Sequence, residues 1–252
     1  MNTKEILEQN SNSWNKIADD WFGKTALPTY GPFTPTEEEL HLLGDVSAKC
    51  VLDIGCGSGH SLCYMGNKGA SELWGIDISS VQLKNASNLL HESGFAPRLF
   101  NSPMEENPGL PQNYFDIVYS IYALGWTMDL EKTMNLVSSY LKPGGVFVFS
   151  WDNPMIQCLE VKHGEIVINR SYQDEMIIDM NKCGEPMSLR KWKLSSYINA
   201  ISNAGMRVVN LIEETDHETL RLKCDFSEKY YSAYKAKIIP MSFIIKAVKC
   251  SD

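Results

Sequence analysis

An acidic residue and three alternating glycines follow a short apolar run in the first quarter of the chain. The stretch VLDIGCGSGH, residues 51–60, places Asp53 two positions before Gly55, and Gly57 and Gly59 follow at alternate positions. Glycine has no side chain and tolerates positive φ, so this backbone can turn tightly and lie flat against a ligand. A helix that begins just after the loop points its first N–H groups at the same place. Strand, glycine loop and helix together indicate a nucleotide-type site.

The spacing of these residues indicates which kind of nucleotide the site binds. A dinucleotide site requires glycines in the form GxGxxG, and here His60 occupies the third glycine position. Asp77 ends a second apolar run, LWGID, at about the distance where a βαβ unit places an acid on the ribose hydroxyls. We therefore predict that Asp77 binds a ribose. The alternative role for Asp77 is the N-cap of the following helix, but we expect Ser79 or Ser80 to take that position.

The form DxGxGxG resembles the cofactor loop of the class I, Rossmann-like S-adenosylmethionine-dependent methyltransferases. Two later motifs, FDIV at residues 115–118 and LKPGG at residues 141–145, strengthen the resemblance, which is to the bacterial small-molecule type. It implies S-adenosyl-L-methionine as cofactor. The cofactor contacts that we expect come from Asp53, Gly55, Cys56, Gly57, Gly59, His60, Asp77, Ile78, Gln82, Met104, Glu105 and Ser120.

The adenine side of this set departs from the family pattern. The family often has an acid that binds the adenine amino group where this chain has Ser102. We expect Met104 to pack on the adenine ring and Glu105, or the backbone, to supply the polar contact.

Methyl transfer requires alignment of nucleophile, methyl carbon and sulfur more than it requires acid–base chemistry. An aromatic pocket that excludes water suits the charge on sulfur. The candidate substrate walls are Trp21, Tyr30, Tyr122, Trp126 and Trp151, with Trp14 beside them.

A general base is needed only for an acceptor that arrives protonated. By its place in the chain Asp152 is the first candidate, with Tyr30 and His163 behind it. Each has a structural alternative: Asp152 as a turn former before Pro154, Tyr30 as a plug in its loop, and His163 as the tip of a hairpin.

The apolar patterns predict an α/β fold with a seven-stranded, mostly parallel, doubly wound sheet and an antiparallel closing strand at 241–249. Residues 1–45 are expected to form a helical lid, in which one aromatic helical face runs from Trp14 to Phe22. Residues 46–252 form the methyltransferase domain, with a small β-rich cap inserted at about 152–192. Thr36 begins a short helix that Gly44 ends, and Ser195 begins a later one.

The bulk composition restricts the partners. The chain has 252 residues, a net charge of −8 and seven scattered cysteines. The negative charge disfavours nucleic acid, no stretch has the length of a membrane span, and the cysteines lack metal-site spacing. We expect a cytoplasmic protein with reduced thiols and no metal, a monomer or homodimer that acts on a small-molecule acceptor.

Two other functions remain open at this stage. The same cofactor and fold could transfer or cyclise the aminocarboxypropyl arm of S-adenosylmethionine, or the chain could be a non-catalytic cofactor-binding or assembly protein. The sequence names neither the acceptor nor the atom that is methylated.

Overall fold

A seven-stranded sheet forms the centre of the computed structural model, which describes residues 1–251. The strand order is β10-β11-β5-β4-β1-β2-β3, and β11 is antiparallel to both of its neighbours while the other pairs are parallel. This confirms the predicted fold class. The strands are β1 Cys50–Ile54, β2 Glu72–Asp77, β3 Arg98–Asn101, β4 Phe115–Ile121, β5 Leu141–Asp152, β10 Met206–Ile212 and β11 Ser242–Lys249.

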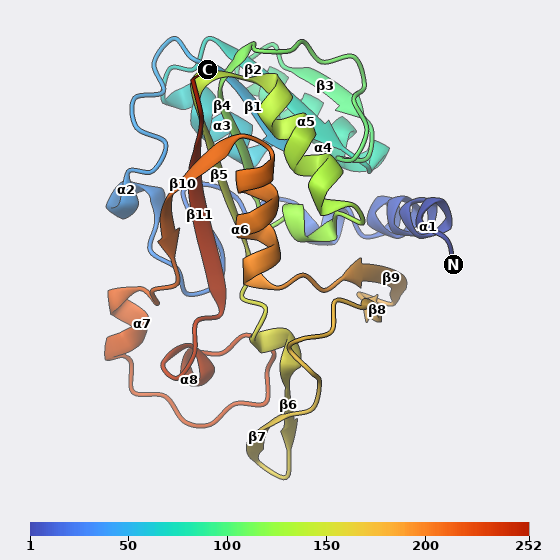
Figure 1. Ribbon diagram of the computed structural model, residues 1–252, viewed down its shortest axis with the longest axis vertical. Helices are drawn as coiled ribbons and strands as arrows, with labels where there is room; N and C mark the ends of the chain where they lie inside the picture. Colours follow the sequence, from blue (N-terminus) through green and yellow to red (C-terminus); the bar gives the residue numbers. More distant parts are fainter. Residues whose placement is uncertain (252) are drawn as a thin grey trace.

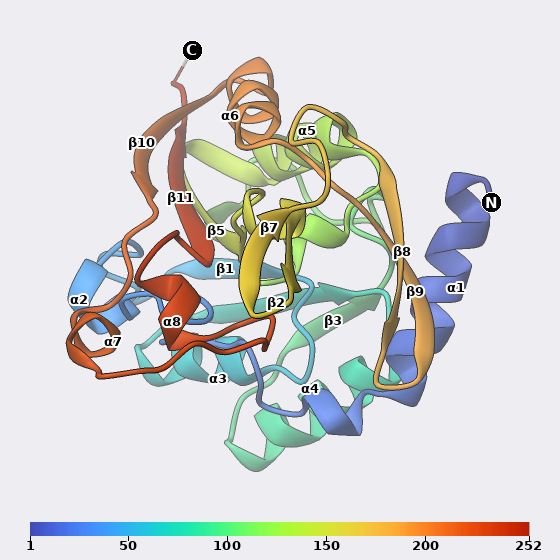
Figure 2. The same ribbon diagram turned by 90° about the horizontal axis from the view of Figure 1, so that it is seen from below.

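Helices cover both faces of the sheet (Figures 1 and 2). One face carries α3 (His60–Asn67) and α4 (Ser80–Glu92), and the other carries α5 (Leu130–Tyr140) and α6 (Leu194–Asn203). The central strand β4 is buried along nearly its whole length, as a parallel sheet covered on both faces requires. Three further helices are short: α2 Glu37–Leu40, α7 His217–Arg221 and α8 Ala233–Ala236.

The first helix, α1 (Thr3–Lys16), is shorter than the aromatic pattern predicts. The chain leaves the helix at Ile17, and Trp21 lies in a separate 3₁₀ turn. A longer helix would place Asp19 and Asp20 near its carboxyl end, where negative charge is unfavourable. The aromatic residues from Trp14 to Phe22 therefore lie on two elements rather than on one helical face.

Two other helix limits also differ from the expectation. The capping box of α2 is present, because Glu39 accepts from the Thr36 N–H at 2.7 Å, but the helix ends at Leu40 instead of running to Gly44. Helix α6 begins at Leu194, not at Ser195. Glu175, from outside the helix, accepts from the Lys193 N–H at 3.0 Å and so satisfies its first turn.

Two β-hairpins follow β5, as the expected β-rich insertion. They pair β6 (Leu159–Lys162) with β7 (Glu165–Ile168), and β8 (Ile177–Lys182) with β9 (Glu185–Arg190). His163-Gly164 and Cys183-Gly184 make the turns, with φ of 53° and 78° and of 53° and 88°. Two positive φ values in a two-residue turn match the twist of the flanking strands.

Helix α1 lies beside the β8–β9 hairpin in both views (Figures 1 and 2). The Asn10 amide donates to the Ser188 carbonyl at 2.7 Å and accepts from the Ser188 N–H at 2.9 Å. The other side of the helix is tied to the carboxyl end of β2, because the Ser11 hydroxyl donates to the Ile78 carbonyl at 2.9 Å. Helix α1 therefore joins the inserted hairpin to the central sheet.

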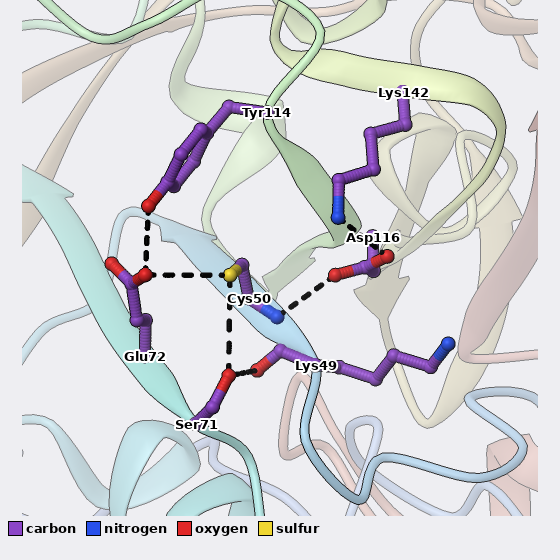
Figure 3. A network of polar contacts seen from close by, with 7 residues as sticks. All are labelled: Lys49, Cys50, Ser71, Glu72, Tyr114, Asp116 and Lys142. Atoms are coloured by element: carbon purple, nitrogen blue, oxygen red, sulfur yellow. Dashed lines mark hydrogen bonds and ion pairs between the residues drawn. The ribbon is translucent and has the colours of Figure 1, made fainter.

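A polar network joins β1, β2, β4 and β5 at the amino ends of the parallel strands (Figure 3). Asp116 of the FDIV motif accepts from the Cys50 N–H at 3.0 Å and from Lys142 of the LKPGG motif at 2.9 Å. Burial alone would raise the pKa of Asp116, but these two bonds hold it below its usual range. Hydrogen bonds from Tyr114 and Trp74 likewise lower the pKa of Glu72.

Within residues 1–251, no helix has both the length and the apolar character that a membrane crossing needs.

Candidate active site

A first cavity, the loop cavity, lies at the carboxyl ends of β1 and β2 and under α1 and the turn that follows it. Every cofactor residue expected from the sequence lines it except Gly59 and Ser120. Carboxyl ends of strands are where open α/β sheets bind ligands. The residues that line it are Asp53, Gly55, Cys56, Gly57, His60, Asp77, Ile78, Gln82, Met104 and Glu105 from the expected set, and Leu7, Asn10, Lys24, Ala26, Ser58 and Ser61 among others.

Gly57 and Gly59 of the glycine loop have different roles. Gly57 has φ of +51°, and a Cβ there would meet nothing within 4 Å, so its backbone faces the open cavity. A Cβ on Gly59 would lie 2.9 Å from the Ala86 side chain of α4, so this glycine permits helix packing rather than ligand contact. Ser120 is also structural, because its hydroxyl donates to the Ile54 carbonyl at 2.7 Å and ties β4 to β1.

Asp77 stands at the edge of the loop cavity with its carboxylate held in place. Its two oxygens accept from the N–H groups of Gly57 and Ser79, each at 2.8 Å. Burial raises the pKa of Asp77 to about 6, and the two hydrogen bonds oppose that rise. Ser79 caps α4 by accepting from the Gln82 N–H at 3.1 Å, so Asp77 is not the N-cap.

Three residues that line the loop cavity each carry a buried polar atom with no hydrogen-bond partner among the described residues. These atoms are Oδ1 of Asp53, Oε1 of Gln82 and Nε1 of Trp21. Burial and the nearby Asp77 raise the pKa of Asp53 well above its usual value. Buried polar groups are normally paired, so this cavity suits a ligand that donates to two of these atoms and accepts from the third.

Ser102, Met104 and Glu105, the residues predicted from the sequence to lie near the adenine, all line the loop cavity. The Glu105 carboxylate accepts from the Thr127 hydroxyl at 2.8 Å and from the Met128 N–H. Its first role is therefore to hold the loop after β4, and only its remaining acceptor capacity faces a ligand.

A second cavity of about 600 Å³, the hairpin cavity, adjoins the first. Residues of both hairpins line it, together with Trp151, Asp152, Tyr230 and Tyr231. The two cavities share one wall, because five residues line both of them. These are Trp14, Trp21, Thr25, Tyr122 and Trp126.

Asp152 is the buried acid of the hairpin cavity, with 7% of its surface exposed. It accepts from the hydroxyls of Tyr231 at 2.6 Å, Tyr122 at 2.8 Å and Tyr230 at 3.2 Å. Burial raises the pKa of Asp152, and the phenol hydrogen bonds oppose the rise. If Asp152 only formed a turn, its carboxylate would not need three phenol donors. These bonds instead fix the Asp152 carboxylate in the wall of the hairpin cavity.

Tyr30 and His163 lie outside both cavities, contrary to the roles first considered for them. Tyr30 has no exposed surface, and its hydroxyl donates to Glu37 at 2.6 Å. It is the plug of its loop. His163 is exposed at the tip of the β6–β7 hairpin. Neither side chain lines a cavity, so the structure does not support either as a base or, for Tyr30, as a substrate wall.

Lys182, at the end of β8, is a site residue that the sequence did not indicate. Its Nζ lies 3.9 Å from the Trp21 ring centroid and 5.2 Å from that of Trp14. Burial lowers the pKa of Lys182, and the charge of Asp152 opposes this. Tyr230 and Tyr231 were missed as well, because they come from an irregular segment far from the motifs. The only feature of the sequence that could have pointed to Tyr230 and Tyr231 is that the two tyrosines are adjacent.

His60 begins α3 at the edge of the loop cavity, where Nδ1 lies 3.1 Å from the Ser58 hydroxyl. Burial lowers its pKa. In the part of the chain that the structure describes, no three His, Cys, Asp or Glu side chains gather as metal ligands, and the seven cysteines are free.

Comparison with known proteins agrees with this geometry. A family model described as a methyltransferase domain matches residues 52–149. A tRNA U34 carboxymethyltransferase from Idiomarina loihiensis is 30% identical over 56% of this chain and 45% of its own length. A ubiquinone biosynthesis O-methyltransferase from Psychrobacter arcticus is 31% identical over 56% of this chain and 62% of its own length.

Among solved structures, an S-adenosylmethionine-dependent methyltransferase from Mesorhizobium loti superposes with a TM-score of 0.67. It is 21% identical, and the match covers 83% of this chain and 95% of that one. The chain spans only about half the length of the curated relatives that it matches. Residues 52–149 thus match a methyltransferase domain, and the chain has the fold of an S-adenosylmethionine-dependent methyltransferase.

Proposed function

We propose that this protein transfers the methyl group of S-adenosylmethionine to a small-molecule acceptor. The observation that carries the proposal is the loop cavity, which is lined by Asp53, Gln82 and Trp21 with their unpartnered buried atoms, by the open Gly57 backbone and by Asp77. When bound there, S-adenosylmethionine supplies an electrophilic methyl group on a sulfonium and leaves as S-adenosylhomocysteine.

The side chains of the loop cavity fit the parts of this cofactor. Asp77 is fixed by two backbone N–H groups, and a carboxylate so held can accept from both ribose hydroxyls. The buried acid Asp53 suits the ammonium of the amino acid end, and the open backbone at Gly57 allows that end to lie close. Trp21 offers its unpartnered Nε1–H to a carboxylate.

The hairpin cavity supports a small acceptor. Its volume of about 600 Å³ lies within the range typical of small-molecule sites. Two inserted hairpins contribute to its walls, and the net charge of −8 opposes an approach by nucleic acid. The two curated relatives described above act on unlike acceptors by their names, so neither names the acceptor of this chain.

Asp152 is the group that could take the acceptor's proton. It faces the hairpin cavity, and its raised pKa brings it closer to the range of a useful base. Trp126 and Tyr122, on the shared wall, would exclude water from the line between donor and acceptor.

Isothermal titration calorimetry with S-adenosylmethionine, and with NAD as control, tests the proposal. We expect binding of the first and none of the second; NAD binding would refute the family assignment of the site. Product analysis then separates the alternatives, because methyl transfer leaves S-adenosylhomocysteine, whereas transfer of the aminocarboxypropyl arm leaves methylthioadenosine. A protein that binds the cofactor tightly and yields neither with any acceptor would be a binding protein.

A further inference from the structure

Three tryptophans on the wall between the two cavities form a box around the ammonium of Lys182. The rings of Trp14 and Trp21 meet edge to face with centroids 5.8 Å apart, and those of Trp14 and Trp126 do so at 5.4 Å. Lys182 Nζ lies 3.9 Å from the Trp21 centroid and 5.4 Å from that of Trp126. Ring faces attract cations, and they do so more strongly where water is excluded. This tryptophan box is thus a cation site, and the chain's own lysine fills it.

Asp152 faces the same cavity as a buried carboxylate without an ion-pair partner. None of the ion pairs within residues 1–251 includes it, and the donors that it has are neutral phenols. Buried carboxylates are normally paired with a cation. Lys182 is close enough for the two charges to influence each other, but it rests on the tryptophans and does not pair with Asp152.

Without Lys182, the other charged side chains that line the hairpin cavity favour a cation. Besides Asp152, they are Glu160, which is partly buried, and Arg170, which is exposed. With Lys182 in the cavity, two positive and two negative side chains line it. If Lys182 moves out, the lining keeps two acids against one arginine.

We propose that the hairpin cavity binds a cationic amine, whose ammonium group takes the place of Lys182 Nζ in the tryptophan box opposite Asp152. Naming this amine as the methyl acceptor rests on the function proposed above, but the binding itself does not. The place of Lys182 at the end of a hairpin makes the exchange simple, since the side chain can leave the box without disturbing the central sheet.

The probe for this site is choline, and its control is 3,3-dimethylbutan-1-ol, which has the same shape without the charge. Tryptophan emission and calorimetry, both without S-adenosylmethionine, report binding to the full-length protein. We expect choline to bind at least about tenfold more tightly than the neutral alcohol. In Lys182→Met, choline binding should tighten about tenfold, because no internal cation has to be displaced.

Two further variants keep the test sharp. Asp152→Asn should weaken choline at least about tenfold and leave the neutral alcohol unchanged. Lys16→Met is the matched control, because Lys16 pairs with Glu185 on the outside of the same hairpin at 2.7 Å and should not alter choline binding. Thermal unfolding of each variant confirms that it folds.

Equal affinity for choline and the alcohol would overturn the inference. So would weaker choline binding in Lys182→Met, or preferred binding of the anion 3,3-dimethylbutanoate, which would assign Lys182 and Arg170 to an acidic ligand. A separate titration with S-adenosylmethionine distinguishes the two proposals. If it binds and choline does not, only the amine site is wrong; if choline binds and it does not, the methyl-transfer function is wrong and the amine site stands.

Discussion

The two ends of the parallel strands carry acids in opposite electrostatic states. At the amino ends, Asp116 has Lys142 and a backbone N–H as partners, and its pKa is lowered (Figure 3). At the carboxyl ends, Asp53, Asp77 and Asp152 have no cation in contact, and burial raises the pKa of each.

We interpret this difference as a division of roles: the acids at the amino ends stabilise the fold, and the acids at the carboxyl ends bind a ligand. A paired acid with a lowered pKa stabilises the folded chain at neutral pH, whereas a buried unpaired one destabilises it. A chain that keeps several costly acids along one sheet edge needs another reason for them, and perturbed acids in a cavity are candidates for function. The following variants test whether the acids at the two ends of the strands have these different roles.

The largest effect is expected from Asp77→Ala. Loss of the charge-assisted contact with the ribose should cost about 1.5–3 kcal/mol, which is a tenfold to hundredfold weaker affinity for S-adenosylmethionine. Calorimetry measures it, with Asp116→Ala as the matched variant from the other end, for which affinity should be unchanged. An unchanged affinity in Asp77→Ala would show that the ribose assignment is wrong.

The affinity for S-adenosylmethionine should also depend on pH through Asp77. Its pKa of about 6 in the folded protein means that the carboxylate is ionised at pH 7 and largely protonated at pH 5. If only the ionised form accepts from both ribose hydroxyls, the affinity falls about tenfold between pH 7 and pH 5. A dissociation constant that stays flat over this range contradicts the assignment. Asp77→Asn should reduce the dependence on pH, and Asp53, whose pKa burial also raises, accounts for any that remains.

The second and third glycines of the loop, Gly57 and Gly59, offer a comparison two residues apart. Gly57→Ala should weaken cofactor binding about tenfold, because its Cβ projects into open cavity, and strain at φ +51° adds about 1 kcal/mol of instability. Gly59→Ala should lower stability more, since its Cβ meets α4 at Ala86. Chemical denaturation and calorimetry on both variants separate the two roles. Equal losses of affinity at equal stability would contradict the division.

The smallest effect is expected from Lys142→Met at the amino ends of the strands. The ion pair with Asp116 is partly exposed, so its loss should cost about 0.5–1 kcal/mol and lower Tm by about 1–4 °C. Binding of S-adenosylmethionine should not change. A thermal scan and one titration suffice, and a large loss of affinity would mean that the two ends are coupled.

The sheet and the cofactor edge could be predicted from the sequence because local signals determine them. Apolar runs at Val51 and Tyr114 mark the strands, and Gly57 and Asp77 follow their strands at spacings that the fold itself imposes. The sequence could not distinguish Gly59 from Gly57, since that difference depends on the approach of a helix from another part of the chain.

The hairpin cavity could be predicted only in outline. Asp152 follows β5 directly, so its place at the sheet edge was readable from the chain. Its partners were not, because Tyr230 and Tyr231 are brought to it from about eighty residues away by an irregular segment. Lys182 reaches Trp14 and Trp21 through the pairing of a hairpin with α1, and no periodicity within either segment indicates that contact.

The double hydrogen bond between Asn10 and Ser188 has a kinetic consequence. Helix α1 lines the loop cavity with Leu7, Asn10 and Trp14, and its Asn10 also holds β9, whose Leu189 lines the hairpin cavity. A movement of α1 that opens the loop cavity would therefore also shift β9 at the wall of the hairpin cavity. On the proposed function, we therefore expect exchange of the spent donor and exchange of the acceptor to be coupled, with this opening as a slow step of turnover.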